Sequence, residues 1–189
     1  MRLISIKMFN KLSEKKLTYL FMGLLVVFAA VMRLVPHIAN VAPVAGLALF
    51  AGAYFNRRYA IALPIAVMFA SDLFIGFYSW KIMLSVYGSF ALIGVMGSML
   101  KENKTFFRVF GTTLAGSMVF FAVTNWAVWA FSPLYEPTLA GLMQSYIMGL
   151  PFLKGTLAGD FMYVGIFFGA YELALYSLKQ KHSLKQHCA

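Results

Sequence analysis

The sequence has little of what a soluble enzyme or a secreted domain depends on. It contains one cysteine, Cys188, six acidic residues and three histidines among 189 residues, so a disulfide framework and a thiolate metal cluster are excluded. Only 12% of the residues are charged and 61% are hydrophobic, whereas soluble domains are about one quarter charged. The abundance of apolar and aromatic residues also excludes a disordered chain. This composition indicates a small integral membrane protein.

Motifs of common enzyme classes are absent as well. The chain has no His-Glu-x-x-His, no Gly-x-Ser-x-Gly and no glycine-rich phosphate loop, and an enzyme needs a nucleophile with a base or a metal constellation. We therefore expect no catalytic residue, no metal and no cofactor. The net charge of +10 would suggest a nucleic-acid partner in a soluble protein. Here the basic residues stand in short tracts between apolar runs, as topology signals do, so we expect no nucleic acid.

Apolar segments recur along the chain at lengths suited to a membrane. A spanning helix needs about 20 mostly apolar residues. The first segment has a basic flank, but it is longer than the apolar region of a signal peptide and lacks a clear cleavage site, so we expect it to be retained. The connection 132–154 carries Pro133, Pro137, Gly149 and Pro151 and is expected to be irregular. The six predicted helices are 17–35, 43–55 (short for a span), 59–77, 81–100, 106–131 and 156–178.

The lysines and arginines predict the orientation of this bundle. Arg33, Lys81 and Lys154 fall on one side of the membrane, and the other thirteen of the 16 basic residues fall on the opposite side, which must be cytoplasmic by the positive-inside rule. The thirteen are Arg2, Lys7, Lys11, Lys15, Lys16, Arg57, Arg58, Lys101, Lys104, Arg108, Lys179, Lys181 and Lys185. We predict an all-α, six-helix domain over 17–178 with cytoplasmic basic segments at 1–16 and 179–189.

Small residues recur every fourth position on the third predicted helix, at Ala62, Ala66 and Ala70. This spacing lets helix backbones approach closely in lipid. Packing within the bundle is the main interpretation, and docking onto another membrane subunit is the alternative, for which these alanines are the candidate partner interface.

Strongly polar side chains are costly in the membrane and therefore mark candidate function. In the predicted topology they come from four helices to one depth, near the outer surface. Aromatic residues accompany them, as expected of a small-molecule pocket that opens outward. The candidate substrate-binding residues are Arg33, His37, Asn40, Asp72, Asn125, Trp126, Trp129, Tyr146, Thr156, Asp160 and Tyr163.

Several of these residues have simpler interpretations. Arg33 could hold a ligand carboxylate through its two-pronged donor geometry, or pair with Asp72 or Asp160, or reach the membrane surface. Trp126 and Trp129 share a helix face and could stack on a planar ligand, but tryptophans at this depth also serve as interfacial anchors.

A series of short motifs carries a family resemblance between Arg33 and Glu172. The chain resembles an uncharacterised family of bacterial inner-membrane proteins grouped with transport proteins. That family is regarded as similar to the substrate-binding S-components of energy-coupling factor transporters. The motifs are Arg33-Leu-Val-Pro36-His37-Ile-Ala-Asn40-Val-Ala-Pro43, Leu49-Phe50-Ala-Gly52-Ala53-Tyr54-Phe55, Ser71-Asp72 with Gly76, Val86-Tyr87-Gly88-Ser89-Phe90, Thr124-Asn125, Tyr135-Glu-Pro-Thr138, and Thr156-Leu-Ala-Gly159-Asp160 with Tyr163.

The resemblance implies a six-helix protein of the bacterial inner membrane that captures a micronutrient from outside. Such proteins work with a transmembrane coupling subunit and a pair of cytoplasmic ATPases. The family pattern has an asparagine directly before the position of Thr156, where this chain has Gly155, so a ligand contact by that amide does not carry over. The first helix also lacks the Ala-x-x-x-Ala docking motif of many S-components and has only Ala29 and Ala30 side by side.

Two other functions remain open from the residues. The first is a stand-alone ion- or proton-coupled carrier in which Asp72 and Asp160 titrate. The second is a structural membrane protein that binds no ligand.

Overall fold

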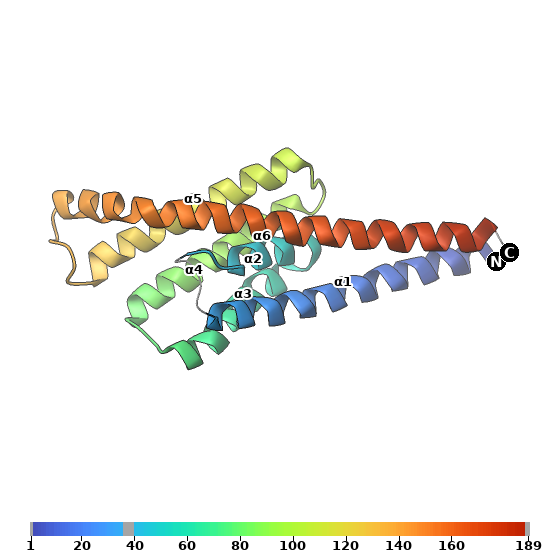
Figure 1. The fold of residues 1–189 in the computed structure, drawn as a ribbon, viewed down its shortest axis with the longest axis horizontal. Coiled ribbons are helices and arrows are strands. Elements are labelled where there is room, and N and C mark those ends of the chain that lie inside the picture. Colours follow the sequence, from blue (N-terminus) through green and yellow to red (C-terminus); the bar gives the residue numbers. More distant parts are fainter. Residues whose placement is uncertain (1, 36–39, 188–189) are drawn as a thin grey trace.

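The computed structural model describes residues 2–35 and 40–187, with side chains for 13–35 and 40–180. Throughout this described part every regular element is helical (Figure 1), which confirms the all-α prediction. The elements are α1 (Arg2–Leu34), α2 (Val44–Tyr54), α3 (Arg57–Ile75), α4 (Trp80–Gly97), a 3-10 turn η1 (Ser98–Leu100), α5 (Phe106–Phe131) and α6 (Leu139–His187).

Five of these helices are long and apolar enough to cross a membrane. The qualifying segments are Ser13–Leu34, Arg57–Ile75, Trp80–Leu100, Phe106–Phe131 and Leu139–Gln180, and α2 is a shorter apolar helix. Many large apolar side chains point outward, including Phe74 and Phe107, a pattern expected where the surrounding solvent is lipid. The architecture is that of a multi-pass membrane protein.

The short helix α2 lies at the centre of the bundle. Each of its residues from Val44 to Ala53 is buried, as expected for a helix that is apolar all round. Its contact with α4 is a backbone contact, because a Cβ atom on Gly52 would lie 2.2 Å from the carbonyl oxygen of Gly94. A Cβ atom on Gly94 would in turn lie 2.1 Å from the carbonyl oxygen of Ala60 on α3. Only glycine fits at these two positions, so α2, α3 and α4 form one tightly packed unit.

Helices α1 and α6 lie side by side at the end of the molecule that holds both termini (Figure 1). The Thr18 and Tyr171 hydroxyl oxygens are 2.7 Å apart, and Lys179 lies 3.7 Å from Glu14 in an exposed ion pair. Both helices extend beyond the rest of the bundle at this end.

The connection after α5 is shorter than the sequence predicts. Only residues 132–138 are irregular, and α6 then runs for 49 residues through Gly149 and Pro151. Gly149 is a packing glycine, since a Cβ atom there would lie 2.3 Å from the side-chain oxygen of Asn125 on α5. Proline is tolerated inside membrane helices when neighbouring groups satisfy the freed backbone carbonyl. At roughly 1.5 Å per residue α6 is about 74 Å long, which exceeds the ~30 Å hydrocarbon layer.

The alanine series of α3 faces away from the bundle. Ala62, Ala66 and Ala70 are all exposed, while the buried residues of α3, among them Ala60 and Val67, lie on the other face. The interpretation of these alanines as internal packing residues is therefore wrong. Their role as a partner interface stays a prediction.

Candidate ligand-binding site

A cavity of about 240 Å³ lies where all six α-helices come together. Helices α1 to α6 each contribute at least one wall residue, and the 40–43 connection and the α3–α4 loop complete the walls. The lining residues are Arg33, Asn40, Ala42, Ala45, Met68, Tyr78, Val86, Phe90, Phe120, Thr156 and Asp160. Four of the eleven candidate residues, Arg33, Asn40, Thr156 and Asp160, are thus brought to one place from distant parts of the chain.

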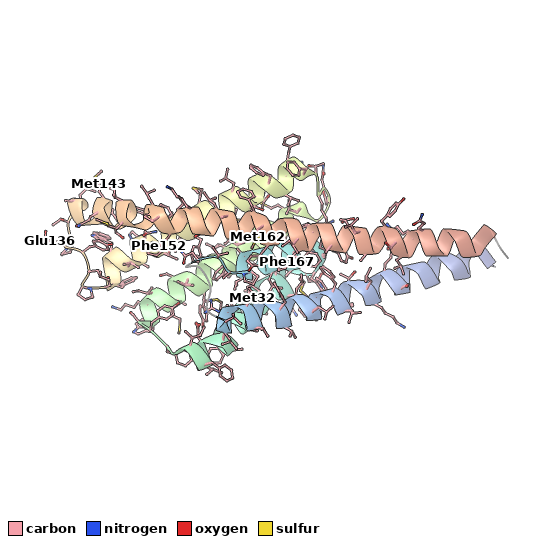
Figure 2. The ribbon with its side chains drawn as sticks, viewed as in Figure 1. Met32, Glu136, Met143, Phe152, Met162 and Phe167 are labelled. Carbon is pink, nitrogen blue, oxygen red and sulfur yellow. The ribbon has the colours of Figure 1, made fainter. Side chains whose placement is uncertain are left out.

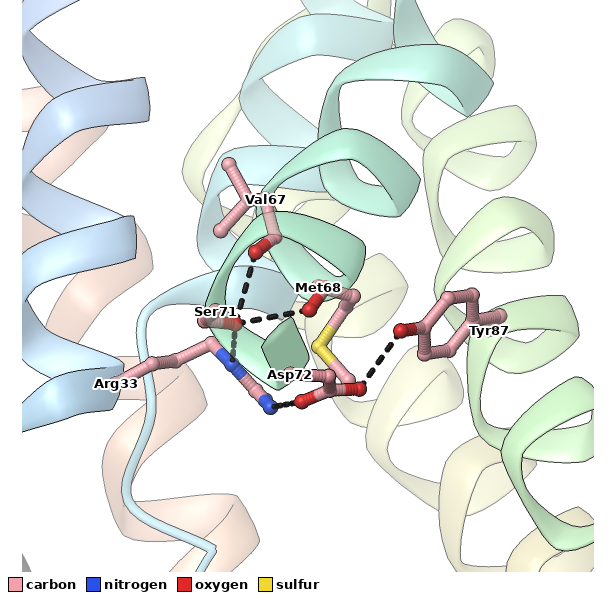
Figure 3. A network of polar contacts seen from close by, with 6 residues as sticks. All are labelled: Arg33, Val67, Met68, Ser71, Asp72 and Tyr87. Atoms are coloured by element: carbon pink, nitrogen blue, oxygen red, sulfur yellow. Dashed lines mark hydrogen bonds and ion pairs between the residues drawn. The ribbon is translucent and has the colours of Figure 1, made fainter. Parts of the chain in front are cut away.

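Arg33 is held by a polar network between α1, α3 and α4 (Figure 3). Its Nε donates to Ser71 Oγ at 2.6 Å, and its Nη2 donates to Asp72 Oδ1. The other carboxylate oxygen of Asp72 accepts a hydrogen bond of 2.7 Å from the Tyr87 hydroxyl. Asp72 is only 1% exposed, so this pairing compensates a charge that burial alone would make very costly. The ionic partner of Arg33 is therefore Asp72 and not Asp160.

Asp160 lies on α6, opposite this network. It is 4% exposed, and its Oδ2 is 2.6 Å from the hydroxyl of Ser117 on α5. Among the residues whose side chains are described, the salt bridges are Arg33–Asp72 and Lys179–Glu14, so Asp160 has no ionic partner within that set. A buried carboxylate that forms no salt bridge is costly to ionise unless other groups stabilise its charge.

The hydroxyl of Ser117 has two acceptors for a single hydrogen. It lies 3.1 Å from the carbonyl oxygen of Thr113 as well as 2.6 Å from Asp160. An ionised Asp160 accepts the hydrogen from Ser117, whereas a protonated Asp160 donates to Ser117 and leaves it free to bond Thr113. Both protonation states of Asp160 can therefore be satisfied without moving a helix.

Aromatic side chains form much of the remaining wall. The rings of Phe90 and Phe120 lie 5.1 Å apart between their centroids, and Tyr78 lies on the α3–α4 loop. Partial burial raises the pKa of Tyr78 to about 12, so its hydroxyl keeps its proton at neutral pH. Asn40 adopts a positive φ of 63°, a conformation that asparagine tolerates better than most residues.

A second group of candidate residues lies on the α5–α6 hairpin and does not line the cavity. Asn125 donates to the Phe121 carbonyl at 2.8 Å, and Tyr146 donates to the Ala122 carbonyl at 2.9 Å. Trp129 donates to the backbone carbonyl of Glu136 at 3.0 Å, and Glu136 marks the end of the molecule opposite the termini (Figure 2). The Tyr146 bond joins α6 to α5, the Trp129 bond joins the end of α5 to the connection, and the Asn125 bond lies within α5.

Three further candidate residues are not among the described residues that line the cavity. Trp126 is 44% exposed and its ring contacts that of Phe131 edge-on. Tyr163 is buried among aromatic rings, including that of Phe167. His37 lies outside the described residues. Among the residues with described side chains, no group of three or more His, Cys, Asp or Glu comes together.

Sequence reasoning did not place Ser117, Tyr78, Phe90 or Phe120 among the candidate binding residues. Aromatic and hydroxyl residues are frequent along these helices, and single ones carry no signal about which face they occupy. The contact of Ser117 with Asp160 joins positions 43 residues apart, which local patterns do not reveal.

The chain belongs to a family of unknown function, DUF6580, whose profile matches residues 13–184. No curated protein and no solved structure matches the chain.

Proposed function

We propose, for this member of a family of unknown function, that the chain is a membrane-embedded subunit that captures a small organic molecule in the cavity around Arg33 and Asp160. The observation that carries the proposal is the cavity itself, which combines a few oriented polar groups with aromatic and aliphatic walls, as small-molecule sites do. Arg33 is immobilised by Ser71 and Asp72, so its remaining donors are aimed before a ligand arrives, which lowers the entropic cost of binding.

The proposal includes an orientation in the bacterial inner membrane. The basic residues near the ends of α1 and α6 and those around Arg57 and Lys101 are placed in the cytoplasm by the positive-inside rule. The end of α1 that carries Arg33 then lies toward the outside, and the cavity collects its ligand from there.

In this proposal, partner subunits supply the energy for uptake. The sequence has no phosphate-binding loop of its own, and the resemblance to S-components implies a transmembrane coupling subunit with cytoplasmic ATPases. The exposed alanines Ala62, Ala66 and Ala70 offer a smooth surface on α3 for such a contact. The ligand in this proposal is a micronutrient.

The experiment is native mass spectrometry of protein gently purified from its own host membrane. We expect a bound small molecule in the wild type that is lost in Arg33→Ala and Asp160→Asn. The matched control is Trp129→Phe, which changes the hairpin and leaves the cavity lining intact. Retention of the molecule by both cavity variants and its loss in Trp129→Phe would move the site to the hairpin. A wild type that is always empty, with no uptake defect in the deletion strain, would contradict the proposal.

An ion-coupled carrier is the second candidate, and the Ser117 hydroxyl favours it. Because Ser117 can bond Asp160 in either protonation state, Asp160 has the arrangement of a proton-carrying group. Asp72 is engaged with Arg33 and Tyr87, so Asp160 would carry the coupling alone. Liposomes that contain only this chain would then accumulate the molecule identified by mass spectrometry when a pH gradient is imposed. Accumulation that requires added ATPases would exclude this second candidate.

A further inference from the structure

We propose that the ligand of the cavity is a small organic cation, a molecule with a protonated or quaternary nitrogen and a net charge of +1. This inference rests on the proposed function, since it concerns the same cavity, and it adds the chemical class of the molecule bound.

The charges of the described lining residues do not balance. Arg33 carries the positive charge, and it is paired with Asp72 directly behind the wall. Asp160 is the second carboxylate, and Arg33 is the one basic residue among the lining residues that the structure describes. With both carboxylates ionised the site holds one uncompensated negative charge. A ligand with one positive charge restores neutrality, whereas a carboxylate ligand would double the imbalance.

The burial of Asp160 strengthens its attraction for a cationic ligand. The residue is 4% exposed, so water screens its charge weakly and a nearby cation is attracted more strongly than at a surface. Only its Oδ2 has a described hydrogen-bond donor, Ser117. The other carboxylate oxygen can accept a hydrogen bond from a ligand ammonium group.

The walls favour a cation for an independent reason. Phe90, Phe120 and Tyr78 line the same cavity as Asp160, and the faces of aromatic rings attract cations, most strongly when the cation is desolvated. The rings of Phe90 and Phe120 form a tilted pair whose planes make an angle of 37°. Aromatic walls around one carboxylate are the chemistry that recognises ammonium groups.

Arg33 supplies the second specificity element. A guanidinium group has five N–H donors, and the described bonds to Ser71 and Asp72 occupy two of its nitrogens. The remaining donors can bind an uncharged acceptor, such as a carbonyl, hydroxyl or ring nitrogen of the ligand. The cavity, about 240 Å³, lies below the ~300–1,000 Å³ range of drug-sized pockets, so the molecule is small.

The test measures binding of charge-matched probes to the full chain in nanodiscs of zwitterionic phosphatidylcholine. The probes are benzylammonium and choline as cations, benzyl alcohol as the neutral analogue and benzoate as the anion. We expect both cations to bind the wild type at least tenfold more tightly than benzyl alcohol, and benzoate to bind more weakly still. Asp160→Asn should abolish the preference for the cations.

Two further variants distinguish the loss of the Asp160 charge from a general disturbance of the fold. Asp160→Glu keeps the charge and should keep the preference for benzylammonium, while Glu102→Gln removes an exposed carboxylate from the α4–α5 connection and should change nothing. Equal binding of the cations by the wild type and Asp160→Asn would overturn the inference. Tighter binding of benzoate that Arg33→Ala abolishes would also overturn it, and would leave the proposed binding function standing. No binding of any probe, together with a wild type that purifies empty, would refute both.

Discussion

The contact between α2 and α4 and the cavity lined by all six α-helices are packed in opposite ways. At the first, Gly52, Gly94 and Gly97 bring helix backbones together and leave no space for a side chain. At the second, Arg33 and Asp72 hold helices at fixed positions while room remains between them. Close glycine contacts between helix backbones in one part of the bundle thus stand beside a polar, open site in another.

Aromatic rings hold α2 against α6 on the side of the bundle nearer the termini. Phe50, Tyr54 and Tyr171 form a cluster of rings with centroids 4.5–5.2 Å apart. The Tyr54 hydroxyl donates to Glu172 at 2.6 Å, and the ammonium group of Lys104 lies 4.8 Å from the Tyr54 ring centroid. Aromatic contacts and a few polar bonds hold this region together, whereas the cavity wall carries the buried carboxylate of Asp160.

The largest expected effect comes from filling the glycine contact. Gly94→Ala places a Cβ atom 2.1 Å from the Ala60 carbonyl oxygen, so α3 and α4 must separate and we expect a loss beyond about 4 kcal/mol of unfolding free energy. The measurement is unfolding in mixed detergent and SDS micelles. The matched control is Gly88→Ala on the same helix, which has no atom within 4 Å of the added Cβ. A similar loss in both variants would show that backbone proximity is not the cause.

The next largest effect is expected from the charge pair beside the cavity. Asp72→Ala leaves the guanidinium group of Arg33 without its counter-ion, which we expect to cost about 3 kcal/mol. The double variant Arg33→Met with Asp72→Ala should recover much of this loss, because no unpaired charge remains. Thermal unfolding of both variants in the same detergent is the measurement. A double variant less stable than Asp72→Ala alone would mean that the pair stabilises the fold by more than mutual charge compensation.

A smaller loss of stability is expected at the wall of the cavity that carries Asp160. Ser117→Ala removes the donor to Asp160, and we expect it to cost about 1–2 kcal/mol when the carboxylate is ionised. Protonation of Asp160 removes the charge that needs a donor, so the cost should shrink as the pH falls. Unfolding measured at several pH values checks this, with Ser177→Ala, an exposed serine that bonds its own helix, as the control. A cost that does not vary with pH would contradict the ionised state of Asp160.

The smallest effect on stability is expected on the outer face of α3. Ala66→Leu adds a large side chain at an exposed position, so unfolding should change by less than about 0.5 kcal/mol. Uptake should fall if this face docks a coupling subunit, because the close approach of helices is lost. Ala91→Leu, at a half-buried position of α4, is the comparison outside the alanine series. Unchanged uptake in Ala66→Leu would argue against docking on this face.

The helices could be predicted from the sequence because their apolar runs are long and sharply bounded. The predicted segment 106–131 coincides with α5, and the predicted segments 43–55, 59–77 and 81–100 differ from α2, α3 and α4 by a few residues, while α1 extends further toward the N-terminus. The prediction was wrong over 139–154, which belongs to α6 although Gly149 and Pro151 were interpreted as helix breakers. Whether a glycine breaks a helix or lets another helix approach depends on the neighbour, here Asn125, which the local sequence does not show.

Part of the candidate site was also accessible from the residues alone. The cost of burying charge in lipid marked Arg33, Asp72 and Asp160, and the structure places all three at or directly behind one cavity. The same argument grouped Asn125 and Trp129 with them, although neither lines the cavity and their side chains donate to backbone carbonyls of α5 and of the α5–α6 connection. Depth along a helix can be read from the sequence, but the direction a side chain faces around the bundle cannot.

From the sequence alone it could be predicted that the protein lies in lipid and that it is helical, because these properties follow from composition and from the length of apolar runs. The same reasoning identified the few residues whose charge must be compensated. Only the tertiary structure decided which charge compensates which. Arg33 had two aspartates within its predicted reach, and the packing of α1 against α3 assigned it to Asp72. That choice left Asp160 without an ionic partner among the described residues, since electrostatic pairing depends on distances that only the packed bundle defines.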